Sequence, residues 1–185
     1  MVRTTAVAAA LLLALAGAAS AATVSFSATP DAAVASPVAN SFTGVYEANT
    51  TGSIPGVKRS PWEGTDLGET GVYSYVTGSA TFSFASDRSR LSFVWGSPDT
   101  YNSVDFFLNG ELVDTFPGFG NGVNVAEAFA TFTNVGDAGR FDQVVFNSGS
   151  PAFEFANVAA VPLPAGGVLL LTALGAAGVL RRRAA

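Results

Sequence analysis

The sequence predicts an all-β protein, a two-layer antiparallel sandwich for which a jelly-roll is the expected topology. Val, Phe, Thr and Tyr, which favour strands, occur in short runs, and Gly, Asn, Asp and Ser interrupt these runs at short intervals. No stretch of the central region repeats its apolar residues with a convincing helical period. About ten strand-like runs fit into the 139 residues from Ala22 to Ala160, which suggests one domain with two packed sheets.

The expected strands follow one another along the whole of this central domain. Within them, strict alternation gives Leu91, Phe93 and Trp95 one common direction, toward the core. The phenylalanines of the other strands are expected to supply much of the remaining core: Phe82, Phe84, Phe129, Phe132, Phe141, Phe146, Phe153 and Phe155. The strands are predicted at residues 23–28, 41–47, 71–77, 80–85, 91–95, 103–108, 111–116, 126–133, 141–147 and 152–158.

The sharpest local signal is a hairpin over residues 103–115, with Asn109-Gly110 as a two-residue type I′ turn. In the register that such a turn sets, Asp105 faces Asp114 across the two strands. Opposed carboxylates repel each other unless water or a cation relieves them, so this pair could give two oxygens to Ca²⁺. Two solvated carboxylates, or a register altered by a bulge, are the other interpretations, since Ca²⁺ takes more ligands than two.

A long segment at residues 48–68 interrupts the strand pattern, because it is rich in glycine and proline. We expect an exposed loop here, of the kind that carries function on a rigid scaffold. Trp62 lies in its middle and has two interpretations, a platform for stacking a sugar ring or a side chain that folds back to cap the core. Tyr101 is a second candidate for glycan contact.

Residues 1–21 have the three parts of a secretory signal peptide. Arg3 supplies the positive charge, residues 6–16 form the apolar region, and Ala19-Ser20-Ala21 is the small-residue cleavage site. We expect signal peptidase to cut between Ala21 and Ala22. An uncleaved N-terminal membrane anchor is the alternative.

Residues 161–185 combine three features in immediate succession. A pentapeptide with two prolines stays extended, an uncharged segment at 165–180 follows, and three arginines end the segment. As a helix, the uncharged segment would span roughly 24 Å, slightly less than a bilayer core. The positive-inside rule keeps Arg181, Arg182 and Arg183 in the cytoplasm, so the tail predicts transient anchoring in the inner membrane with the body outside.

The sequence Val161-Pro162-Leu163-Pro164-Ala165, with the apolar segment and the arginine cluster behind it, resembles a VPLPA-CTERM sorting signal, a relative of the PEP-CTERM tails of Gram-negative bacteria. The resemblance implies that a membrane-embedded exosortase recognises the pentapeptide and removes the helix and basic tail. It also implies a location at the cell surface, in association with exopolysaccharide. Residues 91–102, Asp105-Phe106, 141–146 and 152–155 are similar to segments of ectodomains in that family. A tail anchor that is never cleaved is the alternative.

Composition limits the chemistry of the central domain. It holds all 14 acidic residues of the chain against five basic ones, so its net charge is −9, which disfavours nucleic acid as a partner. The chain has no cysteine and no histidine. Zinc sites and catalytic triads that need these residues are therefore excluded, and only carboxylate, hydroxyl or lysine chemistry is left.

Three functions are compatible with these observations. The leading prediction is an exported, exosortase-processed, non-enzymatic protein of the cell surface or extracellular matrix that contacts exopolysaccharide and needs no cofactor. The alternative is a carbohydrate-binding module assisted by Ca²⁺ in which Trp62 or Tyr101 is exposed. A glycoside hydrolase using two carboxylates ranks last, because no acidic pair stands in a recognisable setting.

Overall fold

The computed structural model describes residues 22–28, 30–119 and 129–163. The predicted signal peptide up to Ala21, residues 126–128 of one expected strand and the predicted sorting tail from Pro164 onward, with Ala165 and Arg181 to Arg183, lie outside these ranges. Within the described ranges, no helix is both long and apolar enough for a membrane span.

The described chain is all-β, as predicted, and its only helical element is the 3₁₀ turn η1 (Gly68–Thr70). Every recorded pair of strands is antiparallel. The strands are β1 (Thr23–Ser27), β2 (Ser41–Thr43), β3 (Tyr46–Thr50), β4 (Tyr73–Val76), β5 (Ser79–Trp95), β6 (Asn102–Leu108), β7 (Glu111–Pro117), β8 (Phe129–Thr133), β9 (Phe141–Ser148) and β10 (Phe153–Pro162).

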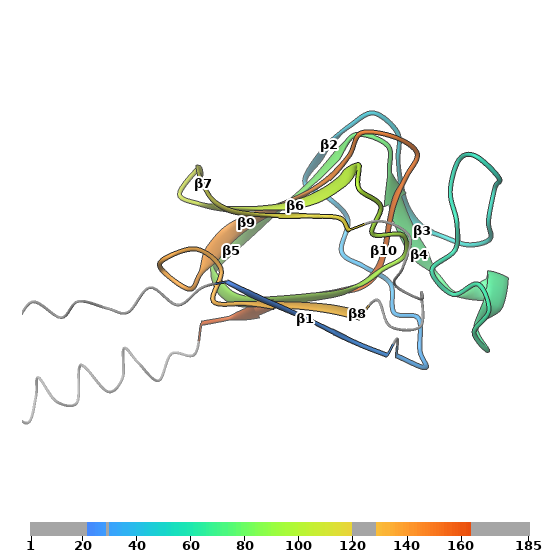
Figure 1. Ribbon diagram of the computed structural model, residues 1–185, viewed down its shortest axis with the longest axis horizontal. Coiled ribbons are helices and arrows are strands. Elements are labelled where there is room, and N and C mark those ends of the chain that lie inside the picture. The colour runs from blue at the N-terminus through green and yellow to red at the C-terminus, as the bar shows by residue number, and fades with distance from the viewer. Residues whose placement is uncertain (1–21, 29, 120–128, 164–185) are drawn as a thin grey trace, which may run out of the picture.

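The strands form one open sheet in the order β3-β4-β10-β5-β9-β6-β7, with β8 and β2 also paired to β5 and β1 paired to β8. The long strand β5 joins two halves of this sheet. Its residues 79–83 and Arg88 pair with β9 and its residues 79–81 with β2, whereas its residues 90–94 pair with β8 and residues between 88 and 95 pair with β10. Figure 1 shows the result, with β6 and β7 on one side of the molecule and β1 and β8 on the other. The arrangement is sandwich-like, and jelly-roll topology stays a prediction.

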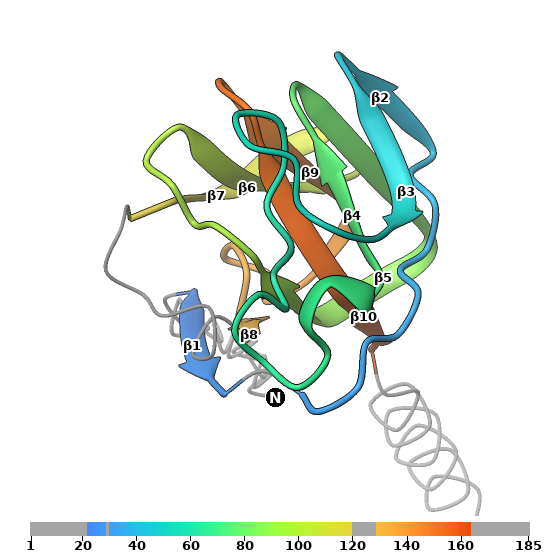
Figure 2. The ribbon, with the colours of Figure 1, turned by 90° about the vertical axis from the view of Figure 1, so that its right-hand side faces the viewer.

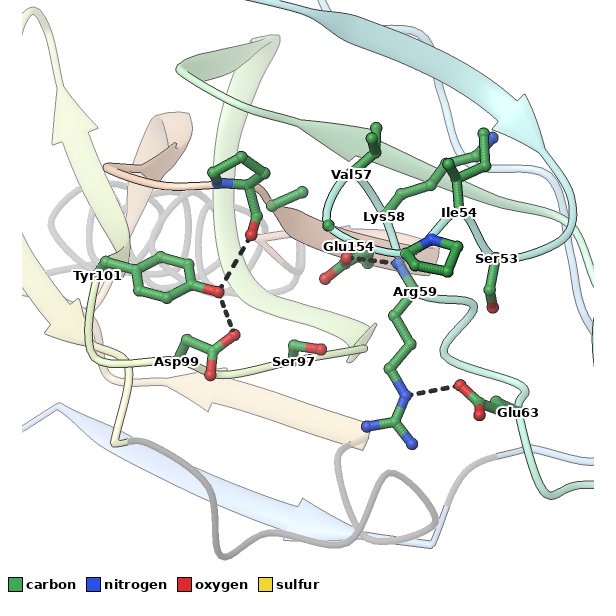
Figure 3. A pocket seen from close by; sticks show the side chains of 14 residues that line it. Ser53, Ile54, Val57, Lys58, Arg59, Glu63, Ser97, Asp99, Tyr101 and Glu154 are labelled. Carbon is green, nitrogen blue, oxygen red and sulfur yellow. Dashed lines mark hydrogen bonds and ion pairs between the residues drawn. The ribbon is translucent and has the colours of Figure 1, made fainter.

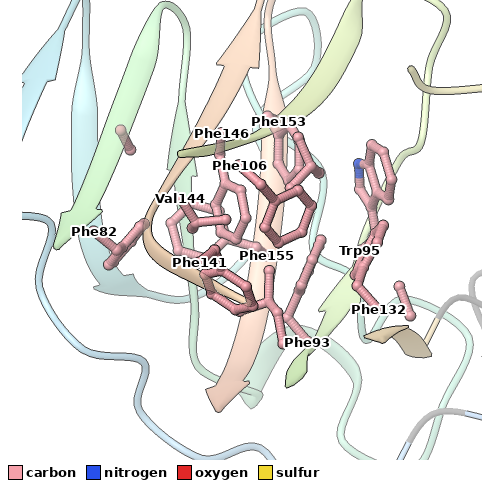
Figure 4. Close-up of a cluster of buried hydrophobic side chains, with 14 of the residues drawn as sticks. Phe82, Phe93, Trp95, Phe106, Phe132, Phe141, Val144, Phe146, Phe153 and Phe155 are labelled. Atoms are coloured by element: carbon pink, nitrogen blue, oxygen red, sulfur yellow. The ribbon is translucent and has the colours of Figure 1, made fainter. Parts of the chain in front are cut away.

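The core lies between these two halves and is aromatic (Figure 4). Phe146 of β9 contacts Phe93 of β5 at 4.7 Å and Phe153 of β10 at 4.9 Å between ring centroids. Phe106 of β6 contacts Phe132 of β8 at 5.4 Å. All five rings are fully buried. Each buried ring of this size contributes roughly 1.5–3 kcal/mol to folding, so these contacts are what hold the halves together.

The expected strands are present, with three differences in their bounds. The run 41–47 is split into β2 and β3, because Gly44, whose φ is +70°, turns the chain between them. The runs 80–85 and 91–95 are one continuous strand, since the polar residues between them keep the extended conformation needed to cross from one half to the other. The last strand continues beyond 158 to Pro162. Figure 2 shows β10 running between β4 and β5.

The ideal hairpin register is wrong beyond its first two pairs, and the alternative, a register altered by a bulge, is confirmed. Phe107 faces Leu112 as expected, but a bulge then places Phe106 opposite Asp114 and Asp105 opposite Thr115. The extra residue in β7 is Val113, which is half-buried and packs against the aromatic core. Asp105 and Asp114 are therefore not cross-strand partners, and the geometric reason for a shared Ca²⁺ ion is gone.

Candidate functional site

The segment between β3 and β4 is folded against the end of the sheet, and only part of it is exposed. Trp62 has 0% exposure, and its Nε1–H donates to the carbonyl of Val72 over 3.0 Å. Gly71 permits this packing, because a Cβ there would lie 2.3 Å from Trp62 Cδ1. Trp62 thus caps a second, smaller core with Tyr73 and Tyr75, and it is not an exposed stacking platform.

Lys58 anchors the same segment to the sheet. It is 7% exposed, and its Nζ donates to Thr50 Oγ1 over 2.6 Å and to Glu47 Oε2 over 3.2 Å. The ammonium also lies 5.2 Å from the ring centroid of Tyr75. The Thr50 hydroxyl and the Lys58 ammonium together lower the pKa of Glu47. The cation is consequently held by β3 and β4 and has an anionic partner there.

A tight turn between β5 and β6 positions Asp99 and Tyr101. Asn102 stabilises this turn, since its backbone N–H donates to the carbonyl of Asp99 and its Nδ2 donates to the carbonyl of Ser97, over 2.9 and 2.6 Å. The Tyr101 hydroxyl donates to Asp99 Oδ2 over 2.7 Å. Burial, followed by this hydrogen bond, raises the pKa of Tyr101, so the phenol stays protonated. Its side chain is 39% exposed, which leaves part of the ring available to a ligand.

These two segments and β10 enclose a pocket of about 460 Å³ (Figure 3). A volume of this size falls in the range of small-molecule sites, roughly 300–1,000 Å³. The folded loop supplies one wall, the turn after β5 supplies the other, and the beginning of β10 supplies the floor. The polar side chains that matter below are Arg59, Glu63, Ser97, Asp99, Tyr101 and Glu154.

Glu154 lies between the two walls and is the most unusual residue of the pocket. It is 2% exposed; its Oε1 accepts the backbone N–H of Arg59 over 2.8 Å, and its Oε2 has no hydrogen-bond partner in the described part of the chain. Burial raises the pKa of its carboxyl to about 7, and the negative charge of Asp99 adds to this, while the Arg59 N–H and the Ser97 hydroxyl act in the opposite direction. A buried carboxylate with an unused oxygen is costly, and it is a frequent mark of functional sites.

The positive charges around the pocket have partners of their own. Arg59 Nε donates to Glu63 Oε2 over 2.7 Å, and Lys58 is held by Glu47 as described above. Glu154 meets the backbone N–H of Arg59 and the neutral Ser97 hydroxyl, and Asp99 receives the neutral Tyr101 hydroxyl. Two carboxylates of the pocket therefore lack a cationic partner among the described residues.

The earlier metal candidates lie elsewhere and have protein partners. Asp105 Oδ2 accepts Asn147 Nδ2 over 2.7 Å, and the two oxygens of Asp114 accept the backbone N–H groups of Thr115 and Gly136 over 2.9 and 3.2 Å. In the ranges that the structure covers, no three acidic residues are grouped to hold a metal ion.

A second, smaller pocket of about 270 Å³ lies beside the Asn109-Gly110 turn. Its polar groups are already engaged, because Asn109 N–H donates to Asp142 and Gln143 Nε2 donates to Ser83 Oγ. The first pocket is thus the better candidate site.

The predicted sorting pentapeptide begins inside the sheet. Val161 and Pro162 are the last residues of β10, opposite Arg90 and Arg88 of β5, and the Leu163 N–H donates to the carbonyl of Asp87. Val161 and Leu163 are 46% and 41% exposed. The described part of the motif is therefore extended and accessible, as its prolines predict.

The fold and the site define an all-β protein with a polar, carboxylate-floored pocket at one end of its sheet. A scan of protein-family models, a search of curated proteins and a search of solved structures each found no match for this chain. The residues themselves must therefore support any assignment of function.

Proposed function

We propose that this chain is an exported, exosortase-processed, non-enzymatic protein of the cell surface or extracellular matrix of a Gram-negative bacterium. Its sandwich, of jelly-roll type, presents one end to exopolysaccharide. The signal peptide and the VPLPA-type tail support export and the location at the cell surface. The pocket supports the contact with polysaccharide and is the observation that carries this part of the proposal, because it combines polar groups with the accessible ring of Tyr101.

The end of β10 is compatible with removal of the tail. Residues 159–162 pair with β5 alone, whereas β4 pairs only with residues 153–155 of β10. No residue after Ala156 belongs to the fully buried core in the described ranges. Cutting the chain after the pentapeptide would accordingly leave the aromatic core and the pocket intact.

Two measurements test the proposal. Mass spectrometry of the protein from its producing cells should find Ala22 at the N-terminus and no residues from the apolar tail. A pull-down with the cells' own exopolysaccharide should retain the wild-type protein and lose the Tyr101→Ala variant, with Phe42→Ala as the control at an exposed ring outside the pocket. An intact tail in the mature protein would contradict processing by an exosortase. Equal retention of both variants would contradict contact between the pocket and the polysaccharide.

One observation favours a second candidate, a glycoside hydrolase. Glu154 has a pKa of about 7, as a general acid needs, and Asp99 is a second carboxylate of the same pocket. Glu154 Oε2, however, is shielded from solvent, which is unfavourable for proton transfer to a glycosidic oxygen. Release of reducing sugar from the exopolysaccharide, abolished by Glu154→Gln, would establish hydrolysis in place of simple binding.

A further inference from the structure

The pocket contains a buried carboxyl group, that of Glu154, with an oxygen that has no partner among the described residues. Three buried side-chain atoms of the described residues have no hydrogen-bond partner, namely Arg88 Nε, Trp95 Nε1 and Glu154 Oε2. Of these residues, only Glu154 lines this pocket. An ionised carboxylate that is buried without a cation is strongly unfavourable, so a cation brought by a ligand would interact with it more strongly than with a solvated acid.

Asp99 strengthens this preference. Its Oδ2 accepts the Tyr101 hydroxyl, and Oδ1 has no donor among the described residues. Because both neighbouring cations are engaged by Glu47 and Glu63, neither neutralises Asp99 or Glu154. The two uncompensated carboxylates make the pocket negative at its floor and on the wall beside Tyr101 (Figure 3).

We infer that the pocket binds a protonated amine, that of a de-N-acetylated amino sugar within a polysaccharide chain, with Asp99 in direct contact and Glu154 beneath it. The choice of a sugar rests on the proposed function, whereas the positive charge follows from the two carboxylates. Glu154 lines the pocket while its Oε2 is shielded from solvent, so this oxygen attracts the amine through the floor. The Tyr101 ring offers an apolar surface to the sugar.

A neutral sugar or a divalent metal fits the pocket less well. A neutral hydroxyl would donate to a carboxylate but would leave its charge uncompensated. Ca²⁺ usually takes six to eight oxygen ligands, and in the described ranges no group of three acidic residues is placed to start such a site.

The experiment measures binding of three tetrasaccharides by calorimetry at pH 7, with the protein purified from its producing cells. The probes are tetraglucosamine, its fully N-acetylated form and cellotetraose. Tetraglucosamine should bind at least about tenfold more tightly than the other two, since a hydrogen bond to a charged group is worth roughly 1.5–3 kcal/mol. Glu154→Gln and Asp99→Asn should each weaken its binding by about tenfold or more.

Asp105→Asn is the matched control, because it removes the same charge from a residue outside the pocket, and it should change the affinity less than about twofold.

The affinity for tetraglucosamine should also be greatest near neutral pH, since acid protonates Glu154 and alkali deprotonates the amine. The charged and titratable groups around Glu154 are Lys58, Arg59 and Glu63 of the loop, Tyr73 and Tyr75 of β4, and Asp99 and Tyr101 of the turn.

Several outcomes would overturn the inference. Equal affinity for the amine and acetyl forms would do so, as would unchanged binding by both acid variants or binding that requires Ca²⁺ and disappears with a chelator. Preference for cellotetraose that is lost in Tyr101→Ala would overturn the amine and leave the polysaccharide function standing. Tight binding of tetraglucosamine without any retention by the native exopolysaccharide would support the inference and contradict the proposed function.

Discussion

The two buried regions of this protein are built from different chemistry. The core between the sheet halves is made of stacked and edge-on phenylalanine rings, such as Phe93, Phe146 and Phe153, which need no polar partner. The pocket end also buries side chains, but two of them, Lys58 and Glu154, carry ionisable groups. The first region stabilises the fold in the ordinary way, whereas the second gives up stability to keep a carboxylate beneath a cavity.

The two regions differ in how much of their structure burial explains. Burial accounts for the phenylalanine rings of the core, and Trp95 Nε1, which has no partner among the described residues, belongs to a residue that does not line the pocket. At the pocket end, the orphan oxygen of Glu154 is unexplained by folding alone. Variants in the two regions should therefore differ in the free energy of unfolding that they cost, and a core ring should cost the most.

Removing a ring from the core should be the most damaging change. Phe93→Ala should lower the free energy of unfolding by about 4 kcal/mol, because the ring contacts four other aromatic rings and leaves a cavity. Chemical denaturation measures this loss. Leu112→Ala, at a side chain that is 57% exposed, is the control and should cost less than about 1 kcal/mol. A loss below about 1 kcal/mol for Phe93→Ala would show that contacts other than those of this ring hold the two halves of the sheet together.

Glu154 should make stability depend on pH in the unusual direction for an acid. Its pKa is about 7 in the folded chain and 4.5 in the reference state, so the folded state holds the proton over a range where the unfolded state has released it. Stability should therefore fall as pH rises from about 4.5 to about 7, by about 3 kcal/mol in all. Denaturation of wild type and Glu154→Gln at pH 5 and pH 8 measures it.

Glu154→Gln should abolish most of the loss of stability between pH 5 and pH 8, whereas Glu63→Gln, at an exposed carboxylate, should keep that loss. The same pH profile in wild type and Glu154→Gln would mean that the carboxyl is not buried as described.

A smaller effect is expected where the loop packs on the sheet. Gly71→Ala should destabilise the protein by about 2 kcal/mol, because its Cβ would overlap the Trp62 ring and force it to move. The indole N–H signal of Trp62 in an NMR spectrum should shift with it. Gly149→Ala is the matched control, since a Cβ there would meet Tyr101 at an ordinary 3.6 Å, and it should be nearly neutral.

The smallest effect belongs to the bulged hairpin. Asp114→Ala should cost about 1 kcal/mol, because its carboxylate accepts two backbone N–H groups that hold the bulge and the turn at Gly136. Glu111→Ala, at the exposed start of β7, should be neutral by comparison. Equal melting temperatures for the two variants would show that the bulge does not depend on Asp114.

The fold was predictable where one simple pattern decides it. Alternation at Leu91, Phe93 and Trp95 correctly predicted their burial, and Asn109-Gly110 correctly predicted the turn. A bulge in the hairpin was only an alternative interpretation, since no local signal marks the extra residue Val113, whose side chain packs against the aromatic core. The merging of two runs into β5 was missed, because polar residues between apolar runs are indistinguishable from a turn until the partner strands are known.

The pocket was predictable only in part. Tyr101 was a candidate on the sequence and does line it, while Trp62 took the capping role that was the alternative interpretation. Glu154 was missed. The sequence Phe153-Glu154-Phe155 did carry a signal, since an acid between two buried phenylalanines at a strand start is unusual, but burial on both faces follows only from the loop packing over β10.

In the proposed function, the pocket between the folded loop and the turn after β5 is the surface that meets polysaccharide. An NMR titration of ¹⁵N-labelled protein with fragments of the native exopolysaccharide tests this most directly. We expect amide shifts confined to Arg59, Asp99, Tyr101, Glu154 and their neighbours, which saturate with added ligand. Shifts that cluster elsewhere on the sheet, or none at all with fragments that the whole protein retains, would contradict it.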